Sequence, residues 1–425
     1  MMPERRVLLD QIGLQTRRLV IEDGRPVEFA VEYKGSEPLV GNLYVARVEQ
    51  VLRGMQAAFV DIGIGKNAFL SLDDLPPAAR DLGDAPRIRR AAPLKPGQEI
   101  IVQVVKEPGG SKGPRVTMNP SFPGKYAVLL PTVEVVGVSR RIEDSAMREG
   151  LLLAARAACP AGMGLIARTL AAEATPELLA EEALSLQSAW QALTQAARTR
   201  KAPALLWDEA GLVARTERDF GVAGQWGAWD DAIETALRRD LRRQVWLPCG
   251  GFLVIDRCEA MTVIDVNSGK FVGKKQVEET MLRLNCEAAV EIARQIRLRD
   301  IGGIIVVDFV DMKSDENRQS VFDAFAQAMA ADRAKHHLHG FTAAGLCELT
   351  RRSVYRSMQS TLQMPCAVCD GSGFVLTPQA EAHDLLREVR RRRFAGDDSV
   401  IMLTVAGDVR EALIQAGLPP GVALV

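Results

Sequence analysis

The sequence predicts a mixed α/β fold for this chain of 425 residues, which is long enough for about two to four domains with sizeable cores. Two observations carry this prediction. Short strand-like runs separated by glycine turns fill the chain up to residue 107, and longer helical stretches alternate with apolar strands from residue 124 onward. The predicted fold is therefore a small β-rich domain joined to an α/β region.

The β-rich part begins with short strands at 17–22 and 27–33. A denser stretch follows at 41–72 and resumes at 98–107, after a loop rich in Pro, Ala and Arg. Five short strands with glycine turns over about 80 residues are typical of a small barrel of the OB type. Such barrels bind single-stranded nucleic acid by stacking bases on exposed aromatic rings.

Two phenylalanines of this stretch, Phe59 and Phe69, are candidates for a stacking surface, and Lys112 in the glycine-rich run 109–113 is a candidate phosphate contact. A role in the barrel core is the alternative for either phenylalanine. The chain has 53 Lys and Arg residues against 54 Asp and Glu residues, a net charge of −1. Any nucleic-acid site must therefore be local.

The α/β region contains helical stretches at 145–158 and 175–198, followed by a long helix at 276–299. This last helix connects an apolar run that ends at Asp265 to another that ends at Asp308. A strand, a helix and a strand in this order predict a parallel pair within one sheet. Both acids then lie at carboxyl ends of strands, where open α/β sheets bind their ligands.

Polar oxygens are concentrated at these two strand ends. Asp265 and Asn267 are two residues apart, so their side chains point to the same side of a strand and suit a cation or a phosphate. The alternative is that they bond nearby backbone amides, as Asp and Asn often do at strand ends. The second run ends in Asp308 and Asp311, so the two strands could share one metal ion. For Asp311 a purely structural role is the alternative.

The seven cysteines predict no disulfide framework, but Cys366 and Cys369 form a C-x-x-C followed by glycines, as in a zinc knuckle. This motif supplies two of the four ligands that a structural zinc ion takes. Two arrangements are open: an internal site completed by Cys347 with a nearby histidine, or a site shared by two subunits about a two-fold axis. The candidate histidines are His336, His337 and His339.

The first residues lack the continuous apolar core of a signal peptide, and no later run offers about 18 uninterrupted apolar residues. We therefore expect a cytoplasmic protein without a membrane span. The use of cysteine also suits a reducing compartment.

Several motifs occur in a fixed order after the barrel residues. They are 137-GVSRRI-142, 162-GMGLIART-169, 262-TVIDVNSGK-270, 295-QIRLRDIGGIIVVDFVDM-312 and 366-CAVCDGSG-373. From near residue 7 to about residue 375, the chain resembles the ribonuclease E and ribonuclease G family. The resemblance implies a magnesium-dependent endoribonuclease that cuts single-stranded RNA in rRNA or mRNA processing or decay, favours 5′-monophosphorylated substrates, and forms a homodimer about a shared zinc ion.

The resemblance also assigns roles to individual positions. Asp265 and Asp308 match the family's magnesium-binding aspartates, and Asn267 matches the asparagine that orients the scissile phosphate. The RNA-binding positions of the family's barrel are matched by Phe59, Phe69 and Lys112. The pocket for a 5′-monophosphate is matched by Gly124, Val128, Arg140, Arg168 and Thr169. The zinc link is matched by Cys366 and Cys369.

The expected fold is an OB barrel embedded in a ribonuclease-H-like α/β catalytic region and followed by a zinc knuckle. The expected parts are N-terminal strands that pack with the α/β region (1–35), the barrel (36–120), a 5′-end-sensing and α/β region (121–220), the catalytic region (232–360), the knuckle (361–375) and a short C-terminal region (376–425).

One stretch departs from the family. Around 221–231, where the family continues through further strands and helices, this chain passes almost at once into the catalytic region. A subdomain near the catalytic region is therefore expected to be largely missing. This departure supports an alternative function, an RNA-binding protein of the same fold with little or no cleavage activity.

Overall fold

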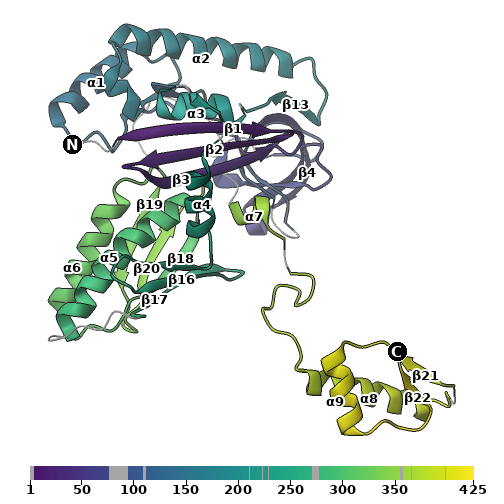
Figure 1. The fold of residues 1–425 in the computed structure, drawn as a ribbon. Helices are drawn as coiled ribbons and strands as arrows, with labels where there is room; N and C mark the ends of the chain where they lie inside the picture. The colour runs from purple at the N-terminus through teal and green to yellow at the C-terminus, as the bar shows by residue number, and fades with distance from the viewer. Residues whose placement is uncertain are drawn as a thin grey trace. The chain divides into compact units, whose positions relative to one another are not determined.

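A computed structural model shows that the chain divides into two compact units, Met1–Thr361 and Leu362–Val425 (Figure 1). The residues that the structure describes are 4–75, 94–108, 112–209, 211–222, 224–227, 229–269, 277–354, 358–364, 366–397 and 399–425.

An antiparallel sheet begins the first unit. Its strands are β1 (Arg5–Ile12), β2 (Gln15–Glu22) and β3 (Arg25–Tyr33), and the short β14 (Gln225–Trp226) pairs with β1 in parallel. Leu9 and Leu19 are fully buried in this sheet. Helix α3 (Leu212–Phe220) packs against β2 and β3.

Five strands then close into a barrel. They are β4 (Leu43–Leu52), β5 (Ala57–Asp61), β6 (Ala68–Ser71), β7 (Glu99–Lys106) and β8 (Arg115–Thr117). The pairing order is β4-β5-β6-β8-β7, and β7 pairs back to β4. The inward side chains Val60, Leu70, Val102 and Val116 are fully buried. The predicted OB-type barrel is thus confirmed as a closed five-stranded barrel.

Shorter elements border the barrel. The strand β13 (Ala204–Trp207) pairs with the outer edge of β4. The 3-10 helices η1 (Arg53–Met55) and η2 (Leu72–Asp74) lie in its connections, and η3 (Thr169–Glu173) belongs to the next sheet.

The next sheet is small and is covered by two helices. Its strands are β9 (Phe122–Pro123), β10 (Ala127–Leu130), β11 (Val136–Val138) and β12 (Gly164–Ala167), in the order β11-β12-β10-β9. The helices α1 (Ser145–Ala158) and α2 (Pro176–Ala197) pack on each other and on this sheet (Figure 1). Each helix begins after a side chain that caps it, Asp144 for α1 and Thr175 for α2.

A six-stranded sheet forms the predicted catalytic region. In spatial order its strands are β15 (Gln244–Trp246), β16 (Phe252–Arg257), β17 (Met261–Asn267), β18 (Gly303–Asp308), β20 (Cys347–Arg351) and β19 (His336–Phe341). The helices are α4 (Asp231–Asp240), α5 (Val277–Leu298), α6 (Asp315–Met329) and α7 (Met358–Leu362). Strands β17 and β18 are parallel and α5 connects them, which confirms the predicted crossover. The likeness of this region to ribonuclease H stays a prediction.

Helices α5 and α6 cover one face of this sheet (Figure 1). In α6, Val321, Phe325 and Met329 recur every four residues and are fully buried, which is the stripe expected of a helix packed on a core. On the opposite face of the sheet, side chains such as Met261 and Ile304 remain exposed. The sheet therefore has one packed face and one open face.

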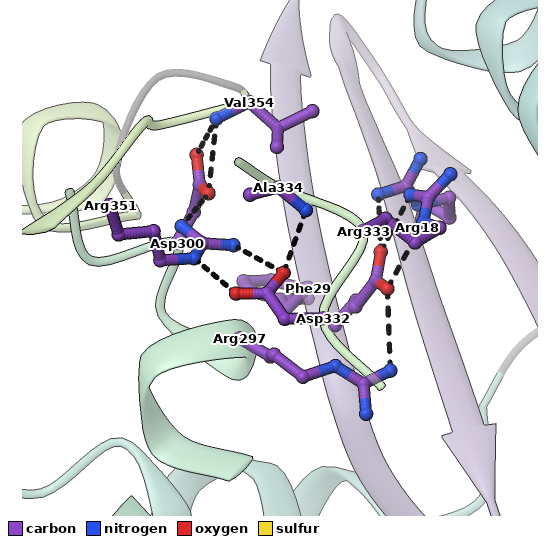
Figure 2. A pocket seen from close by; sticks show the side chains of 10 residues that line it. Arg18, Phe29, Arg297, Asp300, Asp332, Arg333, Ala334, Arg351 and Val354 are labelled. Carbon is purple, nitrogen blue, oxygen red and sulfur yellow. Dashed lines mark hydrogen bonds and ion pairs between the residues drawn. The ribbon is translucent and has the colours of Figure 1, made fainter. Parts of the chain in front are cut away.

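Buried charges join the N-terminal sheet to this region, as Figure 2 shows. Arg351, at the end of β20, donates from Nη1 to Asp300 Oδ1 at 2.7 Å and from Nε to Asp332 Oδ2 at 2.6 Å. A cavity of about 10 Å³ lies among these side chains, which is room for no more than about one water molecule. These buried ion pairs therefore act as a structural joint within the first unit.

Glu28 of β3 is the acidic centre on the other side of the joint. Its carboxylate accepts a hydrogen bond from Arg333 Nη2 at 2.8 Å and one from Arg297 Nη2 at 3.5 Å. Burial alone would raise the pKa of Glu28, but the positive charges of Arg333, Arg18 and Arg297 outweigh it and lower the pKa to about 2. Glu28 is therefore ionised at neutral pH and ties β3 to α5.

The second unit carries the knuckle and a small folded region. The helices α8 (Pro378–Phe394) and α9 (Gly407–Ala416) pack together, and β21 (Ile401–Leu403) pairs in parallel with β22 (Val422–Leu424). Ala382, Val409 and Leu413 form its core. The segment 376–425 is thus an α/β unit with its own core.

Every helix among the described residues is too short or too polar to cross a bilayer.

Candidate functional site

Two aspartates and an asparagine meet at the carboxyl ends of β17 and β18. The parallel register pairs Asp265 directly with Asp308, so both side chains lie on the same, open face of the sheet. Both are exposed. Asn267, two residues after Asp265, donates from Nδ2 to Asp265 Oδ2 at 2.8 Å. Folding therefore brings together the three residues that the sequence analysis selected.

The two carboxylates form a site with excess negative charge. Partial burial, followed by the charges of Asp265 and Asp311, raises the pKa of Asp308 above its ordinary value. A divalent cation between the carboxylates would relieve this repulsion. Exposed carboxylate oxygens suit magnesium, which takes oxygen ligands and keeps several waters.

The protein's own donors at this site are few. Nowhere in the described part of the chain do three or more His, Cys, Asp or Glu side chains gather in an arrangement that could hold a metal ion. Two carboxylates would therefore need water and a substrate phosphate to complete an octahedral set. Lys270, at the end of the 262–270 motif, lies outside the described residues.

A buried asparagine of α5 holds the loop that follows Asp308. Asn285 donates from Nδ2 to the Val310 carbonyl at 2.7 Å and accepts from the Val310 N–H at 3.1 Å. Its side chain is fully buried and makes both bonds to one residue of the loop. Asn285 therefore holds the backbone between Asp308 and Asp311.

The outer surface of the barrel presents the two predicted aromatic rings side by side. Phe59 of β5 pairs directly with Phe69 of β6, and their ring centroids are 6.3 Å apart in an edge-to-face arrangement. Their strand neighbours Val60 and Leu70 are fully buried in the barrel, whereas both rings are only partly buried. The alternation along the strands thus directs both rings outward.

Lys112 is exposed near the same strand. The backbone at Gly113 lies so close to Asn67 that a Cβ at Gly113 would be 2.0 Å from the Asn67 carbonyl oxygen. Two residues further, the Phe69 N–H donates to the Pro114 carbonyl at 2.8 Å. Lys112 is therefore held close to β6, on which Phe69 lies.

The five positions predicted to bind a 5′-phosphate come from one small sheet. Arg168 and Thr169 follow the end of β12, and Arg140 follows the end of the parallel strand β11. Gly124 precedes the antiparallel strand β10, in which Val128 lies opposite Ile166. The ends of β11 and β12 and the start of β10 lie at one edge, so folding gathers four of the five positions there, with Val128 one step into the sheet.

Contacts at this edge hold the arginine in place. Arg168 donates from Nη1 to the Gly124 carbonyl and from Nη2 to Asp219 Oδ1, the latter at 2.9 Å. The hydroxyl of Thr169 lies 3.0 Å from that of Ser139. Arg140, next to Ser139, is exposed. The edge thus presents an anchored guanidinium, a hydroxyl and an exposed guanidinium.

A carboxylate from α2 occupies the neighbouring backbone donors. Glu182 accepts hydrogen bonds from the N–H groups of Lys125, Tyr126 and Ala127 at 2.7, 2.7 and 2.8 Å. A Cβ at Gly124 would lie 2.5 Å from the Glu182 carboxyl carbon. Glycine at position 124 therefore lets the carboxylate approach and order the turn before β10.

The C-x-x-C motif forms a turn in the second unit. The N–H of Gly373 donates to Cys369 Sγ at 3.3 Å, and Asp370 has a positive φ of 46°. Hydrogen bonds from the backbone N–H groups of Cys369 and Val368, and from the Cys369 thiol, lower the pKa of Cys366. Both thiols are free. Two thiols in a tight turn, with backbone donors aimed at sulfur, are a donor set that suits zinc.

Cys347, which the sequence leaves open as a further zinc ligand, is a core residue of β20. It is fully buried, and burial followed by the charge of Glu348 raises its pKa to about 12. A thiolate is therefore strongly disfavoured there. His337 and His339 lie on β19 with ring centroids 4.5 Å apart, and His336 Nδ1 lies 2.9 Å from the Ala334 carbonyl.

Comparison with known proteins decides the family. A sequence model described as the Ribonuclease E/G family matches residues 121–224 and 230–354. Ribonuclease G of Salmonella typhimurium strain SL1344 is 35% identical over 448 aligned positions, which cover 96% of this chain and 92% of that protein. This chain belongs to the ribonuclease E/G family.

Other members of the ribonuclease E/G family are similar to this chain at about the same level of identity. Ribonuclease G of Escherichia coli K12 is 34% identical with the same coverage. Ribonuclease E of Nostoc sp. PCC 7120 is 37% identical over 392 positions, which cover 82% of this chain and 56% of that protein. This family member therefore resembles ribonuclease G over nearly the whole length of both proteins.

The comparisons also bear on the departure around 221–231. The alignment to the Salmonella protein has 448 positions, more than the 425 residues of this chain, so that relative contains residues that this family member lacks. The family match is interrupted between residues 224 and 230, within the stretch that the sequence analysis singled out.

Sequence reasoning missed two residues that shape these sites. Asn285 is a polar residue within an apolar helix face, a pattern that indicates a buried hydrogen bond. Glu182 carries no such signal, because it follows Glu181 in an amphipathic helix where an acidic residue looks like solvated surface. Only the fold shows that its carboxylate reaches the turn at 124–127.

Proposed function

We propose that this ribonuclease E/G family member is a magnesium-dependent endoribonuclease that cleaves single-stranded RNA. The observation that carries the proposal is the parallel register that places Asp265 beside Asp308, with Asn267 bonded to Asp265. This arrangement offers carboxylate oxygens for a divalent cation and an amide for a phosphate at one exposed point.

Different residues would bind the metal ion and orient the scissile phosphate. Asp265 and Asp308 would hold the ion, which when bound polarises a phosphoryl oxygen and lowers the pKa of the attacking water. Asn267 uses one of its two amide N–H donors on Asp265 Oδ2, and this bond fixes the amide plane. Its second N–H is then oriented to donate to an oxygen of the scissile phosphate.

The barrel would supply most of the affinity for RNA. Phe59 and Phe69 lie side by side on its outer surface, and base stacking on such rings contributes roughly 1–3 kcal/mol per base for any base. Lys112, exposed near the same strand, would contact a phosphate. This division predicts that loss of a carboxylate at the sheet affects cleavage far more than binding.

The edge formed by β10, β11 and β12 is the proposed site for a 5′-monophosphate. Arg168 and Thr169 lie side by side there, and Arg140 is exposed next to them. A guanidinium and a hydroxyl suit a terminal phosphate. A substrate that ends in a 5′-hydroxyl would lack the negative charge that the two guanidinium groups would attract. The enzyme should therefore favour 5′-monophosphorylated RNA.

We propose that zinc is shared by two copies of the chain. The knuckle provides Cys366 and Cys369 only, and Cys347 is buried as a core residue. Two knuckles related by a two-fold axis would complete a four-thiolate site and a homodimer.

The decisive experiment measures cleavage of a 5′-monophosphorylated single-stranded oligonucleotide with magnesium and with a chelator. Wild type should cut only with magnesium. Asp308→Asn and Asp265→Asn should abolish cleavage while RNA affinity, measured by fluorescence anisotropy, stays nearly unchanged. Equal cleavage by wild type and Asp308→Asn would contradict the assignment. Tight binding without any cleavage by wild type would instead support the alternative, an RNA-binding protein of the same fold.

A further inference from the structure

The open face of the six-stranded sheet carries an exposed aromatic pair that the proposed mechanism does not use. Trp246 of β15 is 57% exposed, and Phe252 of β16 is partly buried. Their ring centroids are 5.2 Å apart with an interplanar angle of 55°. Two neighbouring aromatic rings on an exposed surface are the kind of arrangement on which nucleic-acid bases stack.

The strand register places this pair in one row with the catalytic asparagine. Trp246 pairs with Phe252, and Phe252 pairs in turn with Asn267. Residues directly opposite each other on neighbouring strands point to the same face. Because strands lie about 4.8 Å apart, Phe252 is one strand spacing from Asn267 and Trp246 is about two.

The two carboxylates proposed to bind the metal ion lie on the same face of the sheet. Asp265 is two residues before Asn267 on β17 and pairs with Asp308 on β18. The neighbours of the aromatic pair, Val245 and Leu253, point the other way and are buried under the helices. The pair is therefore held by a rigid, packed sheet while its rings face the side on which the phosphate would lie.

The loop after Asn267 passes close to the Phe252 ring. Gly269, two residues after Asn267, has a φ of +54°, and a Cβ at that position would lie 2.6 Å from the Gly250 carbonyl oxygen and 3.3 Å from Phe252 Cδ1. The ring thus abuts the loop that leaves the catalytic strand. A substrate in contact with this ring would therefore lie directly beside the loop that follows Asn267.

We propose that Trp246 and Phe252 form a stacking platform for a base that flanks the scissile phosphate. This proposal rests on the proposed ribonuclease function. Stacking on aromatic rings accepts every base, which suits an enzyme for single strands. The platform holds one nucleotide against the sheet, so the neighbouring phosphate is oriented toward Asn267 and the carboxylates.

The first test uses an oligonucleotide with a single cleavage site and two versions of it, each lacking the base on one side of the scissile bond. Trp246→Ala should slow cleavage of the intact substrate about 5- to 150-fold, the range that corresponds to the loss of one stacked base. Wild type should lose a similar factor on one of the two abasic substrates, and Trp246→Ala should cause no further loss on that substrate.

The chain offers a matched control. Trp226 of β14 is also 57% exposed but belongs to the N-terminal sheet. Trp226→Ala should cleave like wild type. The platform is wrong if Trp246→Ala slows the intact substrate no more than Trp226→Ala does, or slows the abasic substrates as much as the intact one. It is equally wrong if Trp246→Ala dissociates an oligomer in light scattering, because the pair would then be a subunit contact.

The second test separates the platform from catalysis. In the Asp308→Asn background, binding of the intact oligonucleotide should quench tryptophan fluorescence, and the additional change Trp246→Ala should remove most of the quench and weaken binding. The abasic oligonucleotide should give little quench with Asp308→Asn alone. If wild type fails to cleave but this quench is found, the proposed activity fails and the platform stands. An undiminished quench after Trp246→Ala overturns the platform.

Discussion

Replacing Asp308 with Asn should stabilise the metal-free protein and destabilise it relative to wild type once magnesium is present. The register places the carboxylates of Asp308 and Asp265 on strands about 4.8 Å apart, on the same exposed face. Two like charges at about 5 Å repel by roughly 1 kcal/mol in water and by about 3 kcal/mol at an effective dielectric constant of 20. Because the site is exposed, we expect a gain near the lower figure, which corresponds to a rise in melting temperature of about 1–3 °C.

Magnesium should reverse the order of the two melting temperatures. An ion at 100 times its dissociation constant would stabilise the wild type by about 2.7 kcal/mol, whereas Asp308→Asn would lose one of the two proposed carboxylate ligands and most of this effect. Thermal unfolding in chelator and in magnesium measures both states. The reasoning is refuted if wild type melts above Asp308→Asn in chelator, or if magnesium raises both melting temperatures equally. Asp311→Asn serves as the graded control, because Asp311 raises the pKa of Asp308 less than Asp265 does.

Three further predictions concern other parts of the chain. Replacing Cys366 and Cys369 together with Ser should remove bound zinc and shift the protein toward monomer in light scattering, whereas zinc retained at one ion per chain would support an internal site. Arg168→Ala should abolish the preference for 5′-monophosphorylated over 5′-hydroxyl RNA in cleavage rates while slowing the 5′-hydroxyl substrate little, and a wild type without any preference would show that the site does not bind a phosphate. Glu28→Gln should lower the free energy of unfolding at pH 7 by about 3–5 kcal/mol in urea titrations, because it leaves buried arginines without their acid. Since the folded pKa of Glu28 is about 2 against an ordinary 4.5, its contribution of roughly 3 kcal/mol is complete above pH 4.5 and disappears as the pH falls toward 2, so the two proteins should converge in acid.

The sequence alone indicated the barrel strands, the long helices and the types of residue at each site. The helical stretch at 276–299 predicts α5, because a helix is recognised from residues that are neighbours in the chain. Apolar runs that end in Asp265 and Asp308 predict the carboxylates at strand ends, and the C-x-x-C of Cys366 and Cys369 predicts a turn with two thiols. Each of these signals is contained within a few neighbouring residues.

The tertiary structure decided which of these residues face one another. A slip of one residue between β17 and β18 would turn Asp308 away from Asp265, and only the packing of the whole sheet under α5 and α6 sets that register. The same register aligns Trp246 and Phe252 with Asn267. Sequence periodicity cannot predict these alignments, because they depend on contacts between segments far apart in the chain, whose relative positions are fixed only when the core has packed.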